Sequence, residues 1–264
     1  MSSYIYETHL HTSTGSACGK SLGSEYIAYY LEKGYTGIIV TDHFFNGNTA
    51  IPPMPWKERV ARFCEGYEIT KREGDRQGLQ VFFGWECRFD GDEYLVYGLD
   101  QTWLENHPEM MEWDHKTHYE KIKEAGGLVV QAHPFRERGY ITEIRLHPFQ
   151  CDAWEVCNAG NPAAQDQLAY EYARQHHIPM TAGSDIHKVG CTLTDETYGV
   201  AFPYRLNSIQ DYVRAIKHGE GTLYTPNNSP LWDDSVTCQT PVFLHDANGK
   251  EQRIGSLSDL FSHL

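Results

Sequence analysis

The chain has 264 residues, of which 40% are hydrophobic and 13% aromatic, and its formal net charge is −14. This apolar content excludes an intrinsically disordered chain, and the length suits a single α/β domain with one large core. The acidic balance argues against general nucleic-acid binding, because that binding depends on clustered Lys and Arg side chains that neutralise phosphates.

Short β-rich runs alternate with helical runs along most of the chain. Strands are expected at residues 4–9, 36–43, 79–86, 93–99, 128–133, 152–157, 178–187, 197–202 and 222–225. Helices are expected at residues 24–35, about 56–72, 116–127, 162–177 and 208–219. Strands that alternate with helices indicate βαβ units and a mostly parallel arrangement, either a barrel or an open doubly wound sheet.

The last part of the chain, from about Asn227, has a different pattern. Ala247-Asn248-Gly249 lies between two extended runs and predicts a hairpin turn. We therefore expect residues 1–226 to form the main α/β domain. Residues 227–264 are expected to form a small hairpin and helix appendage packed on that same domain.

The sequence also bears on where the protein works. No apolar run approaches the ~20 residues needed to span a bilayer, and the first residues lack the basic and apolar regions of a signal peptide. The seven cysteines are scattered and form no C-x-x-C pair, which is typical of reduced thiols. We expect a cytoplasmic protein without a membrane partner.

Five of the predicted strands end in, or are followed directly by, His, Asp or Glu. In an α/β barrel such strand ends converge on one face, where the active sites of these folds lie. We therefore expect a single cluster made of His9, His11, Asp42, His43, Glu86, His133, Asp185 and His187. The other nine histidines are expected to be ordinary surface or core residues: His107, His115, His118, His147, His176, His177, His218, His245 and His263.

A cluster of this composition needs cations. Several carboxylates in one mouth repel one another and raise each other's pKa unless positive charge intervenes. Imidazole and carboxylate ligands suit Zn, Mn or Fe, and a carboxylate between histidines can bridge two ions. Two or three such ions in one site are typical of phosphoester hydrolysis.

Five motifs occur along the chain in a fixed order: His-x-His-Thr at residues 9–12, Thr41-Asp42-His43, Gly84-Trp85-Glu86, Ala132-His133-Pro134 and Gly183-Ser184-Asp185-Ile186-His187. This order resembles that of the PHP (polymerase and histidinol phosphatase) family, over residues 4 to about 190. The resemblance implies a distorted (β/α)7 TIM-like barrel, here within residues 1–226. It also implies phosphoesterase activity with up to three divalent ions.

The resemblance assigns ligands by position. They divide among three ions: His9, His11, Glu86 and Asp185 for the first; Glu86 as a bridge and His133 for the second; His43 and His187 for the third.

Two ligand positions depart from the family pattern. Many relatives have Asp or His after the first motif, whereas this chain has Ser16-Ala17-Cys18-Gly19. Either Cys18 completes the third ion's ligands or that ligand is missing, which leaves two or three ions. A further ligand of the second ion stays open among Glu155, Cys157 and Asn158. Asp42 either binds metal or orients the His43 ring.

We predict a hydrolase that acts on phosphoric ester bonds of a small phosphorylated metabolite or nucleotide. Asp185 and His187 are expected to take part in catalysis. Arg136 is expected to hold the substrate phosphate through paired N–H donors, the alternative being a solvated basic loop. The chain contains no G-x-S-x-G and no Walker A loop, so covalent catalysis is not expected.

Two other functions are compatible with the same residues. A metal-dependent amidohydrolase also begins with His-x-His on its first strand. The second alternative is a barrel that binds metal or a phosphorylated ligand for regulation, without catalysis. The sequence leaves open the substrate, the native metal, mono- or diester cleavage and the oligomeric state.

Overall fold

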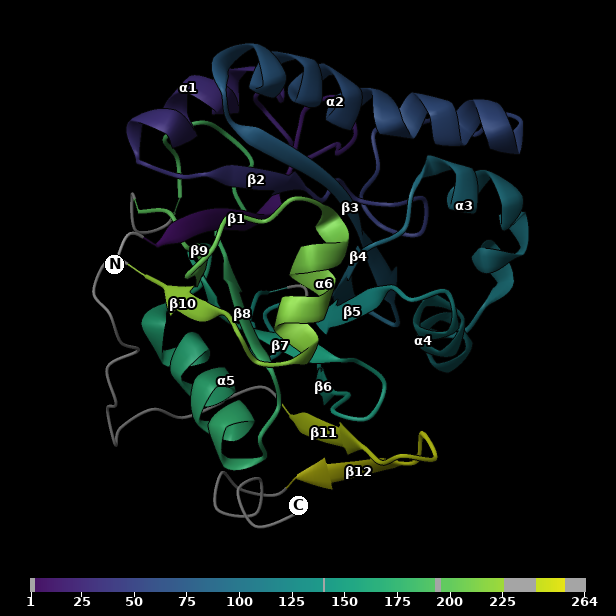
Figure 1. Ribbon diagram of the computed structural model, residues 1–264. Coiled ribbons are helices and arrows are strands. Elements are labelled where there is room, and N and C mark those ends of the chain that lie inside the picture. Colours follow the sequence, from purple (N-terminus) through teal and green to yellow (C-terminus); the bar gives the residue numbers. More distant parts are fainter. Residues whose placement is uncertain (1–2, 140, 193–195, 226–240, 255–264) are drawn as a thin grey trace.

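A computed structural model describes residues 3–139, 141–192, 196–225 and 241–254. Its main feature is a nearly closed, barrel-shaped sheet with the strand order β10-β9-β1-β2-β3-β4-β5-β7-β8 (Figure 1). These strands are β1 (Tyr4–Leu10), β2 (Gly37–Val40), β3 (Gln80–Phe89), β4 (Asp92–Tyr97), β5 (Leu128–Gln131), β7 (Ala153–Asn158), β8 (Met180–Gly183), β9 (Gly199–Phe202) and β10 (Thr222–Tyr224). The distorted TIM-like barrel predicted from the sequence is confirmed.

Backbone hydrogen bonds bring the two ends of the barrel together. The amide of His11, just after β1, donates to the carbonyl of Ile186, just after β8, at 3.0 Å. Leu10 and Ile186 form a parallel bridge at the same point. The chain segments that follow β1 and β8 therefore lie side by side, although 175 positions separate His11 from Ile186 in the sequence.

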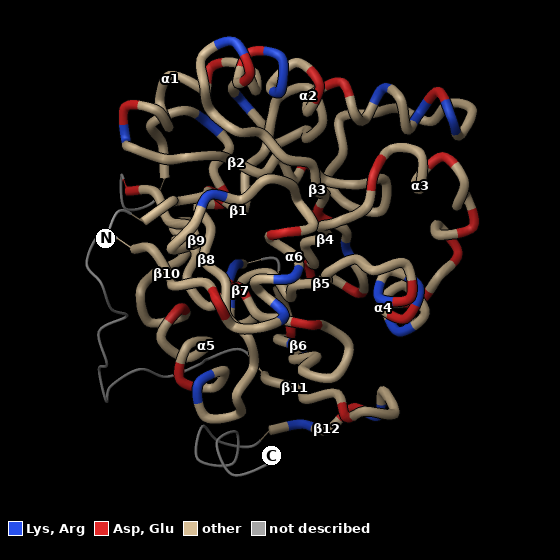
Figure 2. Tube along the Cα trace, in the orientation of Figure 1, with Lys and Arg blue, Asp and Glu red and all other residues tan. Residues whose placement is uncertain are grey.

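Helices pack around the barrel. Those described are α1 (Glu25–Glu32), α2 (Trp56–Gln77), α3 (Gln101–Asn106), the 3₁₀ helix η1 (Pro108–Glu112), α4 (His115–Glu124), α5 (Ala163–Gln175) and α6 (Ile209–Lys217). Acidic and basic residues are mixed along α2 (Figure 2), where Lys71 pairs with Asp75 and Arg76 with Glu73. Within the described ranges, none of the helices has the length and apolar content needed to cross a bilayer.

Helix α6 closes one end of the barrel. Its buried Tyr212 and Ile216 belong to a hydrophobic cluster that includes Tyr97 and Leu128. Tyr97 ends β4 and pairs with Leu128, the first residue of β5, so this cluster lies at the end of the barrel away from the strand termini that carry the histidines. Among the described residues, the site therefore opens at the end of the barrel opposite α6.

The sheet contains more antiparallel pairing than the sequence predicted. Strands β3 and β4 form a hairpin in which Glu86 pairs with Leu95, and β4 is also antiparallel to β5. The turn between them is Asp90-Gly91, with φ angles of 50° and 103°. An Asp-Gly pair with positive φ is the usual connection of a tight hairpin, and it reverses the chain. This signal is present in the sequence and explains the difference.

A second, small sheet lies beside the barrel. It has the order β12-β11-β6 and consists of β6 (Ile144–Leu146), β11 (Val242–His245) and β12 (Glu251–Ile254). The predicted C-terminal hairpin is confirmed, because β11 and β12 pair antiparallel. Strand β6 was not predicted; it has only three residues. The predicted helix of the appendage and the boundary at residue 226 lie outside the described residues, so that domain division stays a prediction.

Candidate metal centre

The structure brings the predicted ligands together at the open end of the barrel. They come from the ends of β1 and β8, from within β3 and from the turns after β2 and β5. We call this group the metal centre; it comprises His9, His11, His43, Glu86, Glu93, His133, Asp185 and His187. Three sets of side chains within it have ligand atoms that all lie within 4.8 Å of one another: His11, His43 and His187; His9, His11 and Glu86; and His43, Glu86 and Glu93.

Glu86 lies in the middle of the metal centre. Its Oε1 is 3.2 Å from Nε2 of His9 and 3.7 Å from Nε2 of His133, and its Oε2 is 2.9 Å from Nδ1 of His43. These contacts lack hydrogen-bond geometry: among the described residues, both oxygens, His43 Nδ1 and His133 Nε2 are buried without a hydrogen-bond partner. Buried polar atoms left in this state are costly. A carboxylate bridging two cations would satisfy them.

The rings of His9 and His11 are held by their other nitrogen. Nδ1 of His9 is 2.9 Å from Oε1 of Glu155, and Nδ1 of His11 is 3.0 Å from Oγ of Ser16. With Nδ1–H donated in each case, the two Nε2 atoms keep their lone pairs, yet they face each other at 3.1 Å. Facing lone pairs repel unless a cation lies between or beside them. The arrangement fits a metal ion, with a carboxylate orienting the ligand from behind.

The pKa of His9 reflects the carboxylates that surround its ring. Burial alone would lower this pKa, but the carboxylates of Glu155, Asp185 and Glu86 raise it well above its ordinary value. The pKa of His11 is instead lowered, first by burial and then by the neighbouring His187 and His43. The field that favours a proton on His9 also favours a divalent cation at the same point.

Asp42 lies behind the metal centre. Its Oδ1 accepts hydrogen bonds from the Thr12 amide and from Ser16 Oγ, at 2.6 and 2.7 Å, and its Oδ2 accepts from Thr12 Oγ1. Because Ser16 donates to Asp42, Ser16 can only accept from His11 Nδ1. Of the two roles considered, ligand or orienting group, the geometry favours orientation, and the ring that Asp42 orients through Ser16 is that of His11.

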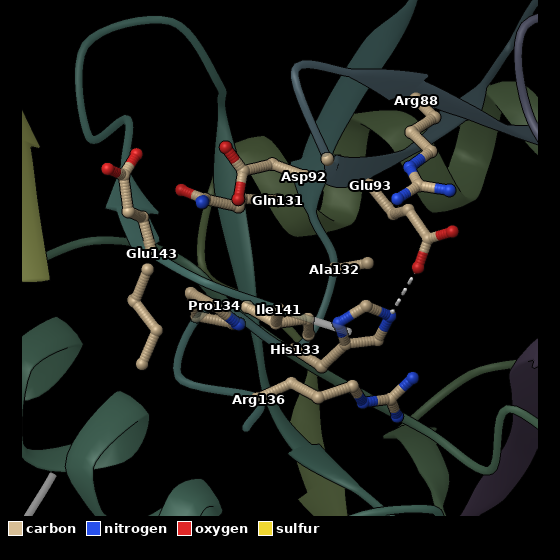
Figure 3. A pocket seen from close by; sticks show the side chains of 12 residues that line it. Arg88, Asp92, Glu93, Gln131, Ala132, His133, Pro134, Arg136, Ile141 and Glu143 are labelled. Atoms are coloured by element: carbon tan, nitrogen blue, oxygen red, sulfur yellow. Dashed lines mark ion pairs between the residues drawn. The ribbon is translucent and has the colours of Figure 1, made fainter. Parts of the chain in front are cut away.

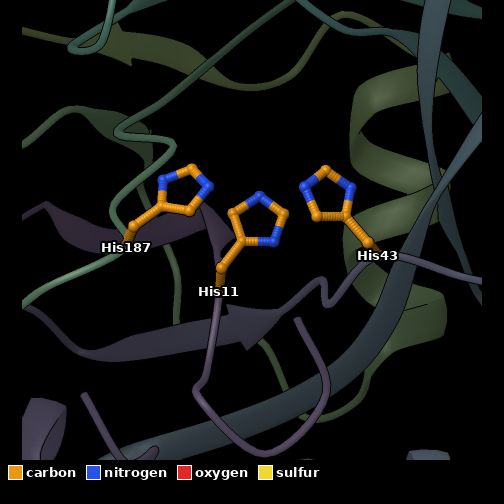
Figure 4. A group of neighbouring side chains, drawn as sticks. All are labelled: His11, His43 and His187. Atoms are coloured by element: carbon orange, nitrogen blue, oxygen red, sulfur yellow. The ribbon is translucent and has the colours of Figure 1, made fainter. Parts of the chain in front are cut away.

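Three histidine rings stand in a row on one side of the metal centre. Figure 4 shows His11 between His187 and His43, with ring centroids 4.4 Å from each. Cys18 lies beside His43 and His187. Burial alone would raise the pKa of the Cys18 thiol, but hydrogen bonds with His187 and His43 lower it to about 6. Cys18 thus lies next to the two outer rings of this row, and its role as a ligand stays a prediction.

The sequence analysis missed Glu93. Its Oε2 lies 3.5 Å from Nε2 of His133, the pair marked by the dashed line in Figure 3. Glu93 is the second residue of β4, whereas the predicted ligands lie at the C-terminal ends of strands. Because β4 runs antiparallel to β3, its first residues lie at the same face as the last residues of β3. Recognition of the Asp-Gly turn would have identified this residue.

The three residues left open for the second ion are engaged elsewhere. Glu155 accepts from His9 through Oε1 and from the His133 amide, at 3.2 Å, through Oε2. Asn158 donates to Glu155 and accepts from Arg136, at 2.7 and 2.8 Å. Cys157 is buried in the hydrophobic core. Glu93 is therefore better placed than any of the three to serve beside His133.

Arg136 is buried and held by three partners. It donates to Asp185 Oδ2 at 2.6 Å, to Asn161 Oδ1 at 2.7 Å and to Asn158 Oδ1 at 2.8 Å. These bonds use much of the guanidinium to fix Asp185, whose Oδ1 faces His9 and His11. The side chain of Arg88, in contrast, is exposed, and no hydrogen bond or ion pair joins it to another described residue.

A buried carboxylate aligns the backbone beneath the ligands. Oε1 of Glu7 accepts from the amides of His9 and Ser184, each at 2.9 Å, and Tyr30 donates to Oε2 at 2.6 Å. Burial raises the pKa of Glu7 to about 7. Asp185, which follows Ser184, has a φ of 51°, and a positive φ is uncommon for a residue with a side chain. Glu7 thus helps to hold the strained Asp185 backbone against β1.

The metal centre opens into a cavity of about 430 Å³. The cavity is large enough for a small metabolite. Its walls include the metal-centre carboxylates and the two arginines; some of its lining residues are Cys18, Asn46, Arg88, Glu93, Arg136 and His187.

Comparisons with known proteins give structural neighbours only. No protein-family model and no curated protein matches the sequence. A two-domain protein from Bacteroides vulgatus, containing a predicted PHP-like metal-dependent phosphoesterase, matches with a TM-score of 0.62 and 17% identity over 84% of this chain. The chain covers 65% of that protein's length.

Two further solved structures match with a TM-score of 0.52. One, from Bifidobacterium adolescentis, is proposed to be a metal-dependent phosphoesterase; it is 16% identical over 80% of this chain and 94% of its own. The other is an amidohydrolase from Chromobacterium violaceum with bound sulfate and no metal, 15% identical over 80% of this chain and 96% of its own. At these identities the likeness shows a shared fold.

Proposed function

We propose that this chain is a metal-dependent hydrolase that cleaves phosphoric esters of a small phosphorylated metabolite or nucleotide. The observation that carries the proposal is the set of buried, unpartnered ligand atoms that converge on Glu86. The PHP-like neighbours, which are named as phosphoesterases, support the same class of reaction.

The residues of the metal centre suit two or three divalent ions of the Zn, Mn or Fe type. The expected ligands, grouped by ion, are His9, His11, Glu86 and Asp185; Glu86, Glu93 and His133; His43, His187 and Cys18. When bound, such ions lower the pKa of water and neutralise charge on the transferred group.

The protein's own side chains would position the substrate and manage protons. Arg136 keeps Asp185 aligned, and the unpaired guanidinium of Arg88 is available at the cavity to donate paired hydrogen bonds to phosphate oxygens. Phosphate binding, first expected of Arg136, is thus better suited to Arg88. If two ions are bound and His187 holds no metal, its side chain, 32% exposed at the cavity, would be placed to pass a proton to a leaving oxygen.

An amidohydrolase is the second candidate, because the Chromobacterium neighbour shares the fold over nearly its whole length. The two functions differ in what must be bound beside the metal ions. A phosphoester presents a tetrahedral dianion, which the Arg88 guanidinium can hold in bidentate fashion, whereas an amide gives this group no ionic partner. Arg88 therefore favours the phosphoester.

A substrate panel tests the proposal. The full chain, loaded with Zn²⁺, Mn²⁺ or Fe²⁺, is assayed with phosphomonoesters, phosphodiesters, cyclic nucleotides and amides, and we expect turnover of a phosphoester. Asp185→Asn and His9→Ala should lower bound metal and turnover together, without unfolding the chain. Asp75→Asn, on the exposed face of α2, is the matched control.

Unchanged turnover in both site variants, or cleavage of amides alone, would contradict the proposal. Binding of phosphoesters without any hydrolysis would point to the regulatory alternative.

A further inference from the structure

A second group of histidines lies beside the barrel, away from the metal centre. It joins four separate parts of the chain: the start of β4, the start of α4, the residue after β6 and the end of β11. We call it the hairpin cluster; it comprises Asp92, His115, His147 and His245. The ring centroids of His147 and His115 are 4.7 Å apart, and those of His147 and His245 are 4.1 Å apart.

Three buried polar atoms of the hairpin cluster make no hydrogen bond within the described part of the chain. Among the described residues, His115 Nε2, His245 Nε2 and Asp92 Oδ2 are buried and make no hydrogen bond. His115 is only 9% exposed, and it lines a cavity of about 350 Å³ together with His147 and His245. Asp92 Oδ2 lies 3.6 Å from His147 Nε2, a spacing close to that between two ligands of one metal ion. Buried polar atoms without a hydrogen bond are costly, and coordination of a metal ion would satisfy them.

The chemistry of the cavity favours a cation over an anion. Burial, followed by repulsion from His147, His118 and His245, lowers the pKa of His115 to about 2, so this ring is neutral and offers a lone pair. The carboxylates of Asp92 and Glu251 lie at 3.6 and 3.2 Å from imidazole nitrogens of the cluster. Neutral imidazoles beside carboxylates are the ligand set of zinc and related ions.

Among the residues that the structure describes, Arg145 is the cation that lines this cavity, and it is already engaged. Arg145 donates to the carbonyl of Asp90 at 2.8 Å and to Glu143 at 2.5 Å. Its guanidinium also lies 3.8 Å from Glu251 and 4.0 Å from Asp92. The guanidinium is therefore surrounded by acceptors of the protein, and it leaves the buried Nε2 atoms of His115 and His245 without a hydrogen bond to any described residue.

We propose that the hairpin cluster binds a divalent transition-metal ion, with zinc as its representative, which links the C-terminal hairpin to α4 and β4. The rings of His115 and His147 are nearly perpendicular, at 83°, and are therefore not stacked face to face. His245 stacks on His147 at 26° and lies at the rim, with its side chain 15% exposed. The ligand atoms are more widely spaced than in the metal centre, so the ring of His245 turns toward the ion when it binds.

Zinc stoichiometry of the full chain tests this proposal. The variants are His147→Ala, inside the cluster, and His245→Gln, at its rim, where a change is least disruptive to folding. His218→Ala, an exposed histidine on the C-terminal side of α6, is the matched control. After equilibration with Zn²⁺ and removal of free metal, we expect each cluster variant to hold one zinc ion per chain fewer than wild type and His218→Ala. Phosphoesterase turnover should be unchanged, because the metal centre is intact.

Hydrogen exchange provides a second readout. Zinc should slow exchange of the β11 and β12 amides in wild type and in His218→Ala, and not in His147→Ala or His245→Gln. If both cluster variants keep the wild-type zinc content and the same zinc-dependent protection, the hairpin cluster is not a metal site. That result would leave the proposed hydrolase untouched, since His9→Ala tests the metal centre separately.

Discussion

The metal centre and the hairpin cluster are built from the same residue types, but their rings are held differently. In the metal centre, Glu155 and Ser16 fix the rings of His9 and His11 from behind. In the hairpin cluster, the rings of His147 and His245 stack on each other. Among the described residues, Nε2 of His115 and Nε2 of His245 make no hydrogen bond. A histidine ring whose second nitrogen is hydrogen-bonded is preorganised to bind a catalytic metal ion. Stacked rings can rotate to meet the ion proposed to link the C-terminal hairpin to α4 and β4.

Two consecutive residues of β4 belong to different groups, one to the hairpin cluster and one to the metal centre. Asp92 and Glu93 are neighbours on β4, and successive side chains of a strand point to opposite sides. Figure 3 shows Glu93 directed toward His133 and Asp92 directed away from it. The β3–β4 hairpin therefore supplies a carboxylate to each group, and changes in it test whether the two groups depend on one another.

The largest effect is expected for Glu86→Gln. The change keeps the shape but removes the negative charge that contacts His9, His43 and His133. We expect loss of metal from the metal centre and a fall in turnover of more than about 100-fold, beyond the range typical of residues that only orient ligands. Metal analysis and phosphatase assays measure this, with Glu120→Gln, exposed on α4, as the control. Zinc bound at the hairpin cluster should remain; its loss would show that the two groups are coupled.

A smaller effect is expected for Glu155→Gln. This carboxylate accepts the proton of His9 Nδ1, and the amide of glutamine can present its N–H₂ there and disfavour the required tautomer. We expect metal affinity to fall about 10–100-fold, as for other residues behind a ligand. Competition with a chelator of known affinity measures the change. Unaltered affinity would mean that the Glu155 contact does not prepare His9 for metal.

The smallest effect is expected for Gly91→Ala. Gly91 has a φ of 103°, and an added Cβ would be strained by the backbone rather than by neighbours, since the nearest atom is 4.0 Å away. We expect a loss of about 1–2 kcal/mol in the free energy of unfolding, measured by urea denaturation. Gly139→Ala, in open space without a positive φ, is the control. Equal stability of the two variants would show that the turn geometry is unimportant.

Much of the architecture could be predicted because its signals are local. The alternation of β-rich and helical runs predicted a barrel or an open doubly wound sheet, and the family resemblance pointed to the barrel. The last residues of the strands predicted which side chains meet. His9 and Asp185 are 176 positions apart in the sequence, yet both follow the same rule about strand ends, and the structure places them 3.4 Å apart. Ligand roles at these positions stay predictions, which metal analysis will test.

What could not be predicted depends on contacts between remote segments. Glu155 lies within a strand and contacts His9 only because β7 and β1 face the same interior. The sequence predicts ordinary surface or core roles for the histidines of the hairpin cluster, because His115, His147 and His245 share no motif and no strand-end position. Only the pairing of β11 with β6 brings His245 beside His147.

The packing of α6 across one end of the barrel has a consequence for the proposed hydrolase. Because Tyr212, Ile216 and their neighbours fill that end, substrate would enter and product would leave through the same opening, at the metal centre. On the proposed function, released phosphate would leave past Arg88, the side chain proposed to bind the next substrate. Phosphate release, rather than bond cleavage, would then be able to limit turnover, and added inorganic phosphate should compete with substrate.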